Sequence, residues 1–145
     1  KFVKKNDNVI DVGCGTGILS IIAVKLGAGH VSAVDIDEVA VRVARENCTI
    51  NGVSDQVSVT KGVLADLQPQ KADIVVANII ADVVIGLAEQ VPEYLNNGGL
   101  FLTSGIIKER KEDVVKSYTS LGFQLESIDE MGEWVAIVFK CPDSL

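Results

Sequence analysis

Short apolar segments recur along the chain and alternate with longer segments of mixed polarity. Five of the short segments are rich in Val, Ile and Leu, and such runs predict buried β-strands. They occupy residues 8–12, 30–36, 56–60, 72–79 and 100–105. Strands that are apolar on both faces, like residues 72–79, are typical of parallel sheets with helices on both sides.

The segments between these strands carry apolar residues at helical spacing. A first helix is predicted over residues 17–28, with an apolar side made of Leu19, Ile22, Ala23 and Leu26. Asp37 is suited to cap a second helix over residues 38–51, with an apolar face made of Ala40, Val43, Ala44 and Cys48. Two more helices are predicted over residues 82–95 and 108–122.

The last part of the chain departs from this alternation. Residues 123–140 predict two strands joined by a turn near Met131 and Gly132, and strands joined so tightly are antiparallel. The fold class is therefore α/β: a doubly wound, mainly parallel sheet of seven strands, into which the final hairpin inserts the seventh strand. We expect one domain over residues 1–140 and a frayed tail over residues 141–145.

Composition and charge limit the partners and the cellular location that we expect for this protein. The 145 residues carry a formal net charge of −7. This charge disfavours direct binding of nucleic acid and suits a basic partner, although it also favours solubility. No apolar run approaches the roughly 20 residues of a membrane span, and the first residues do not form a secretory signal. The three cysteines include no CxxC pair, so we expect no metal site and a reducing, cytoplasmic location.

A glycine-rich motif, "DVGCGTG", follows the first predicted strand at residues 11–17. Its spacing is G-x-G-x-G and differs from the G-x-G-x-x-G of dinucleotide-binding proteins. Asp11 precedes the first glycine, and a carboxylate there repels a pyrophosphate but attracts a cation. We interpret Cys14 as a small residue in a tight turn, because nothing in the sequence pairs it with the single histidine, His30. The motif predicts a ligand that brings a positive charge close to the backbone.

Two aspartates stand at the end of the second predicted strand. A carboxylate at this place can accept hydrogen bonds from both hydroxyls of a ribose, and the alternative role is helix capping. We assign ligand binding to Asp35, because it directly ends the apolar run, and capping to Asp37.

The glycine motif, together with Asp35, resembles motif one of the Rossmann-like methyltransferases that use S-adenosylmethionine. The resemblance implies that the loop passes beside the methionine part of the cofactor and that Asp11 helps to hold its amino group. It also implies contacts with the adenosine and, after methyl transfer, release of S-adenosylhomocysteine. At the third strand, the alternative to an adenine contact is an ordinary loop. The cofactor-binding residues expected on this basis are Asp11, Gly13, Gly15, Thr16, Gly17, Asp35, Ile36, Gly62, Val63 and Asn78.

The end of the fourth predicted strand bears on the substrate. In many amino-group methyltransferases this place reads Asn or Asp, Pro, Pro and an aromatic, and the resemblance assigns Asn78 to accept from the attacking nitrogen. Here Asn78 is followed by Ile79, Ile80 and Ala81. The missing aromatic argues against a flipped base or a glutamine side chain as substrate, which leaves an aliphatic amine. We expect Asn78 to be the catalytic residue and to be a buried amide with hydrogen-bond partners.

Five segments together resemble the catalytic domain of the methyltransferases of large-subunit ribosomal protein eleven: "DVGCGTGILSIIAVKLGA", "AVDIDEVAVRVARENCTINGV", "KADIVVANIIAD", "GGLFLTSGI" and "GEWVAIVFK". The resemblance implies N-methylation of lysine or α-amino groups of a basic ribosomal protein. It also implies a separate N-terminal recognition domain. The chain does not begin with Met, and we expect that domain to be absent from it.

The sequence is also compatible with other functions. One alternative is a methyltransferase of the same fold that acts on RNA or a small molecule, which the acidic charge and the missing aromatic disfavour. Another is a non-catalytic adenosine-binding module. A nicotinamide dehydrogenase is disfavoured by the glycine spacing. The sequence leaves the oligomeric state open.

Overall fold

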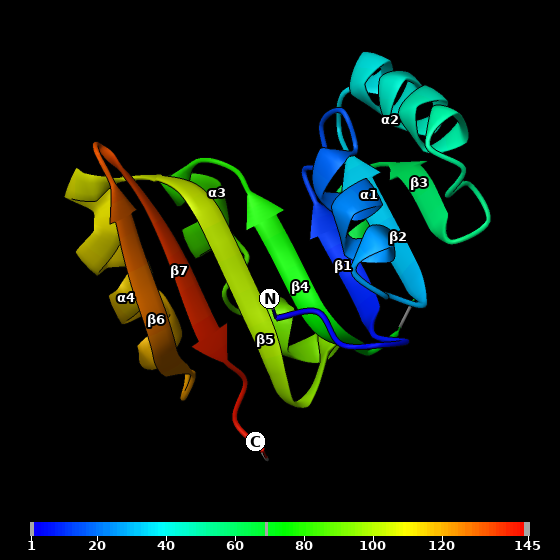
Figure 1. The fold of residues 1–145 in the computed structure, drawn as a ribbon. Coiled ribbons are helices and arrows are strands. Elements are labelled where there is room, and N and C mark those ends of the chain that lie inside the picture. Colours follow the sequence, from blue (N-terminus) through cyan, green and yellow to red (C-terminus); the bar gives the residue numbers. More distant parts are fainter. Residues whose placement is uncertain (1, 69, 144–145) are drawn as a thin grey trace.

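A computed structural model describes residues 2–68 and 70–143, which form one seven-stranded sheet with helices on both faces (Figure 1). The strands are β1 (Asn8–Val12), β2 (His30–Asp35), β3 (Val57–Lys61), β4 (Ala72–Asn78), β5 (Leu95–Ile107), β6 (Gln124–Met131) and β7 (Trp134–Lys140). Their order in the sheet is β3-β2-β1-β4-β5-β7-β6. β1 to β5 pair in parallel, and β7 runs antiparallel between β5 and β6. The predicted fold class is confirmed.

The fifth strand differs most from its prediction. It begins at Leu95 rather than at residue 100, so that the "NNGG" segment belongs to the strand. A register shift against β4 between Ala72 and Ile74 accommodates this segment. Irregular pairing of this kind leaves no mark on hydrophobic periodicity, because the residues concerned are Asn and Gly.

The helices are shorter than predicted. The α-helices are α1 (Ile18–Lys25), α2 (Glu38–Ile50), α3 (Ala81–Gly86) and α4 (Lys111–Thr119), and the 3₁₀ turns are η1 (Leu64–Asp66), η2 (Val91–Tyr94) and η3 (Lys108–Arg110). The single helix predicted over residues 82–95 is wrong, because α3 ends at Gly86 and Pro92 stands in the separate turn η2. Proline lacks the N–H that would continue an α-helix.

The apolar side predicted for the first helix is also wrong. Of the four residues assigned to it, only Ala23 is buried, whereas Leu19, Ile22 and Leu26 are exposed. The helix instead buries Ser20, Ile21 and Ala23. In the second helix, Val41 is buried with the expected Ala44 and Cys48, and the expected Ala40 and Val43 are half-buried.

Two apolar clusters hold the helices to the sheet. α1 and α2 pack against one face over β1 to β3, through residues such as Ile21 and Ala44. α3 and α4 pack against the other face, where Phe101, Tyr118 and Phe139 stack with ring centroids 4.7–6.4 Å apart. The hydroxyl of Tyr118 donates to the Val84 carbonyl at 2.8 Å and so joins α4 to α3.

Cys141, the first residue of the predicted frayed tail, is held against the sheet. Cys141 is buried, and its N–H donates to the Gly99 carbonyl at 2.8 Å. Residues 144 and 145 lie outside the described residues. Among the helices that the structure describes, none is long and apolar enough to cross a membrane.

Candidate functional site

The glycine-rich loop crosses the carboxyl end of the sheet between β1 and α1. The N–H groups of Gly13 and Cys14 both donate to the Val34 carbonyl of β2, at 2.8 and 3.0 Å. These bonds turn the chain sharply as it leaves β1. In doubly wound sheets, this edge at the switch of strand order is where ligands bind.

Two of the loop glycines have different structural reasons to be glycine. Gly13 has a φ of +72°, and a Cβ on it would lie 2.5 Å from the Ile79 side chain, so both backbone conformation and packing favour glycine there. Gly15 has a φ of +55°, and a Cβ built on it meets nothing within 4 Å. Gly15 therefore presents bare backbone to open space, as a loop that cradles a ligand must.

Asp35 fixes the shape of this loop. Its Oδ2 accepts the Gly15 N–H at 2.9 Å and its Oδ1 accepts the Asp37 N–H at 2.9 Å. Each carboxylate oxygen has a second lone pair, so the half-buried Asp35 can also accept from hydroxyls. Asp37 caps α2 as predicted, because its Oδ1 accepts the Val39 N–H at 2.9 Å.

Asp11 is the most unusual group at the site. It is 1% exposed, and its Oδ2 accepts the Ser20 hydroxyl at 2.7 Å. Its Oδ1 has no partner among the described residues. Burial raises the pKa of Asp11 to about 6; the nearby charge of Asp35 also raises the pKa, while the Ser20 hydrogen bond lowers it. A buried carboxylate oxygen without a donor is costly, and an ammonium group would satisfy it.

Ser20 is a residue of the candidate site that the sequence analysis did not identify. It lies on α1 and is 1% exposed, as Asp11 is. It does not belong to the side of the helix that the apolar spacing selected, although it lies one turn before Ala23 of that side. A small polar residue inside an apolar helix was the available signal.

Cys14 is unsuited to nucleophilic chemistry. Its thiol is buried, and burial together with the charges of Asp11 and Asp35 raises its pKa to about 12. His30 lies at the opposite end of the sheet, where its ring contacts Ser58. These positions support the interpretation of Cys14 as a residue of the turn. The structure describes no group of three or more His, Cys, Asp and Glu residues that could hold a metal ion.

The residues expected to contact adenosine surround this edge. Ile36 and Val63 are 71% and 48% exposed, and Thr16 is also exposed. The Gly62 N–H donates to the Asp35 carbonyl at 2.9 Å, which brings the start of the β3 loop beside the end of β2. Exposed Ile and Val side chains at this edge can pack on a flat ring.

The expectation that Asn78 is buried is wrong. Asn78 is exposed, and its side chain makes no hydrogen bond with the described residues. It ends β4 opposite Ser104, and a Cβ on Gly105 would lie 2.7 Å from its Oδ1. Because β4 ends here, solvent satisfies the amide, which is free to meet a ligand.

Two cavities have walls that do not include these residues. One, of about 450 Å³, has Asp73, Asn96 and Lys140 in its wall, at the opposite end of the sheet. The other, of about 470 Å³, runs along α2 at Arg42, Arg45 and Lys61. Neither wall includes a residue of the predicted site. The chemistry of the loop, and not the size of a cavity, therefore points to the candidate site.

The strand order and the loop at the carboxyl ends of β1 and β2 define the class: a Rossmann-like methyltransferase fold. Residues 1–142 match the family described as ribosomal protein L11 methyltransferase (PrmA), and the chain belongs to this family. It is 61% identical over 145 residues to the ribosomal protein L11 methyltransferase of Acetivibrio thermocellus, and 57% identical over 147 residues to that of Ruminiclostridium cellulolyticum. In each case the match covers all of this chain and 46% of the relative. The chain thus spans about half the length of the curated relatives that it matches.

Solved structures agree with this assignment. The crystal structure of ribosomal protein L11 methylase from Lactobacillus delbrueckii subsp. bulgaricus is 34% identical, with a TM-score of 0.91 over 97% of this chain and 72% of that chain. An RNA methyltransferase from Salinibacter ruber in complex with S-adenosyl-L-homocysteine has a TM-score of 0.79 at 20% identity, over 99% of this chain and 86% of that chain. At that identity, the second likeness shows the fold alone.

Proposed function

We propose that this chain binds S-adenosylmethionine at the carboxyl ends of β1, β2 and β3 and transfers its methyl group to an amine of ribosomal protein L11. The observation that carries the proposal is the buried Oδ1 of Asp11, which has no partner among the described residues. It lies on the strand that leads into the bare backbone at Gly15. An amino acid ammonium, as in the methionine part of the cofactor, supplies the donor that this oxygen lacks.

The other loop residues fit the rest of the cofactor. Asp35 can accept from ribose hydroxyls with the lone pairs that Gly15 and Asp37 leave free. Gly13, Thr16 and Gly17 complete the loop, and Ile36, Gly62 and Val63 form the edge for the adenine. When bound, the cofactor supplies an activated methyl group on its sulfonium.

The chain's own contribution to the reaction is positioning. Alignment of reacting groups alone accounts for a large part of the rate of such transfers. The Oδ1 of Asn78 can accept from the incoming amine and so orient its lone pair toward the cofactor. A lysine amine with a pKa of about 10.4 must lose its proton first, and release of that proton to water before binding requires no protein base.

A basic ribosomal protein suits the net charge of −7, and we propose that the enzyme acts in the cytoplasm without direct nucleic acid contacts. We also propose that the part of its relatives beyond these 145 residues adds to substrate recognition. A stable protein interface buries about 800 Å² on each partner, which is more than the edge around Asn78 offers.

Calorimetry tests cofactor binding directly. The chain is expected to bind S-adenosylhomocysteine and not NAD, and Asp35→Ala should weaken binding by about 1.5–3 kcal/mol, as for a lost hydrogen bond to a charged group. Val39→Ala, at an exposed residue of α2, is the control and should bind as the parent does. Binding of NAD, or of neither ligand, would refute the proposal.

A further inference from the structure

A row of three exposed apolar side chains crosses the sheet at the end where Asn78 lies. Ile107 of β5 pairs with Trp134 of β7, and Trp134 pairs with Met131 of β6. Directly paired residues of antiparallel strands point to the same face. The three side chains are 41%, 51% and 64% exposed, respectively. We name Ile107, Trp134 and Met131 the apolar row.

The face on which the row lies follows from its neighbours. Ile106 and Val135, which pair one step away, are 0% and 1% exposed and belong to the core on the α3 and α4 side. The row therefore points to the opposite face. Asn78 points there too, because Val75 and Ala77 of β4 face the α3 and α4 core and the side chains alternate.

The row is close to the proposed point of methyl transfer. Asn78 pairs with Ser104, and β5 continues from Ser104 to Ile107. Three residues of strand span at most about 10 Å, and the irregularity of β5 between Thr103 and Ile106 shortens this distance. Figure 1 shows the turn between β6 and β7 at the same end of the sheet as the carboxyl ends of β1 and β4. A peptide of a few residues can reach from the row to Asn78.

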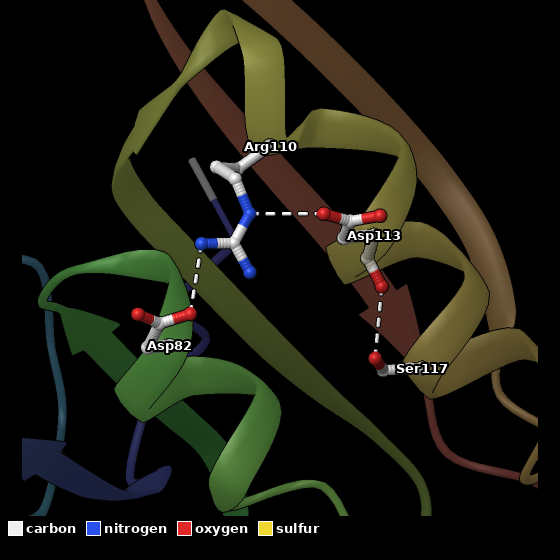
Figure 2. Close-up of polar contacts among 4 residues, drawn as sticks. All are labelled: Asp82, Arg110, Asp113 and Ser117. Atoms are coloured by element: carbon white, nitrogen blue, oxygen red, sulfur yellow. Dashed lines mark hydrogen bonds and ion pairs between the residues drawn. The ribbon is translucent and has the colours of Figure 1, made fainter.

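The basic residues near the row form ion pairs with acidic neighbours. Lys108 and Lys111 both pair with Glu130, at 3.2 and 2.9 Å. Arg110 bridges Asp82 and Asp113, at 2.8 and 2.9 Å, as Figure 2 shows. The positive charges of η3 and of the start of α4 are therefore neutralised by nearby carboxylates.

Two carboxylates beside the row, in contrast, are not paired with a basic side chain of the described residues. Asp129 lies two residues from Met131 on the same face of β6, and Glu133 directly precedes Trp134. Neither makes an ion pair with the residues that the structure describes. The surface therefore combines apolar contact area with unpaired negative charge, which complements a basic polypeptide and repels nucleic acid.

We propose that the apolar row is the docking surface for the lysine-bearing segment of the ribosomal protein substrate. This proposal rests on the proposed function and names where that function recognises its protein substrate. Trp134 packs on the aliphatic stems and ammonium groups of lysines, and Asp129 and Glu133 pair with neighbouring basic residues. The amine that follows is then delivered to Asn78.

Trp134 also reports on the row, because it is the single tryptophan of the chain. Its fluorescence is measured while ribosomal protein L11, with any tryptophan replaced by phenylalanine, is added. Binding at the row should shift the emission to shorter wavelength and protect Trp134 from quenching by acrylamide. Added salt should weaken the effect, because the rim charges are exposed.

Variants separate the row from the cofactor site. Trp134→Ala should weaken binding of ribosomal protein L11 about tenfold, as for an anchoring tryptophan, and should raise the KM for the protein without changing kcat or the affinity for S-adenosylhomocysteine. Trp134→Phe should restore most of the binding. Ile50→Ala, at a 79% exposed residue of α2, is the matched control and should bind as the parent does.

The outcomes distinguish the two proposals. If S-adenosylhomocysteine binds but Trp134→Ala binds ribosomal protein L11 as tightly as the parent does, the row is not the docking surface, while the proposed function stands. An equal fluorescence shift with a ribosomal RNA fragment would likewise overturn the row as a protein-docking surface. If the parent chain does not bind S-adenosylhomocysteine, the proposed function itself fails.

Discussion

Removing the Ser20 hydroxyl should make cofactor binding depend on pH near neutrality. Ser20 donates the hydrogen bond to Oδ2 of Asp11, while Oδ1 is left for the ammonium of the cofactor. Asp11 must be ionised to hold that ammonium. Ser20→Ala takes away a bond that favours the ionised form, so the pKa of Asp11 should rise.

The size of the effect follows from the pKa. With a pKa of about 6, Asp11 is about nine-tenths ionised at pH 7. A lost hydrogen bond to a charged group is worth about 1.5–3 kcal/mol, which moves the pKa of Asp11 to about 7–8. The ionised fraction at pH 7 then falls about two- to tenfold, and the affinity for S-adenosylhomocysteine falls by the same factor.

The sign of the pH dependence follows from the need for an ionised Asp11, and the raised pKa sets the pH range. Affinity is lost as pH falls through the pKa of Asp11, below about pH 6 in the parent and below about pH 7–8 in Ser20→Ala. The other ionisable groups facing Asp11 are Asp35, whose charge raises the pKa of Asp11, and the neutral thiol of Cys14. Neither is altered by the substitution.

Calorimetry with S-adenosylhomocysteine between about pH 5 and pH 8 measures this shift. Asp11→Asn is the control, because it cannot titrate and should bind weakly at every pH. Thermal unfolding of each variant identifies any loss of fold. If Ser20→Ala and the parent lose affinity over the same pH range, the Ser20 hydroxyl does not stabilise the ionised form of Asp11. If Asp11→Asn binds as tightly as the parent does at pH 7, the assignment of the ammonium to Oδ1 is refuted.

Three further predictions concern the loop, the reaction and the contribution of the rest of the relatives' length. Gly15→Val should still fold, at a lower unfolding temperature because valine is strained at a φ of +55°, and should lose binding of S-adenosylhomocysteine. Gly13→Val should unfold at a still lower temperature, because its φ is +72° and its side chain also meets Ile79. Binding of S-adenosylhomocysteine by Gly15→Val would show that the loop is only structural. Asn78→Ala should lower kcat far more than cofactor affinity, and equal losses in methyl-transfer and binding assays would make it a cofactor residue. The part of the Acetivibrio thermocellus relative that matches this chain should bind the cofactor without the rest of that protein. It should methylate ribosomal protein L11 orders of magnitude more slowly than the whole relative does. Equal rates of the two proteins would contradict this prediction.

Much of the fold and the loop could be predicted from the sequence. Apolar runs separated by helical spacing determine a parallel sheet, and the tight turn before Trp134 determines an antiparallel end. The spacing of the glycines and the acid at Asp11 predict a ligand-binding loop at the carboxyl end of β1. These features are local, because each depends on residues adjacent in the chain.

The tertiary structure decided what depends on distant residues. The sequence of α1, "ILSIIAVK", is apolar on nearly every side, so periodicity could not tell which side is buried. The contact between Ser20 and Asp11 marks that side, and it also makes Ser20 part of the site. The exposure of Asn78 and the alignment of Ile107, Trp134 and Met131 depend likewise on where strands end and how they pair. Register is a property of two strands together, and hydrophobic patterning along one strand does not contain it.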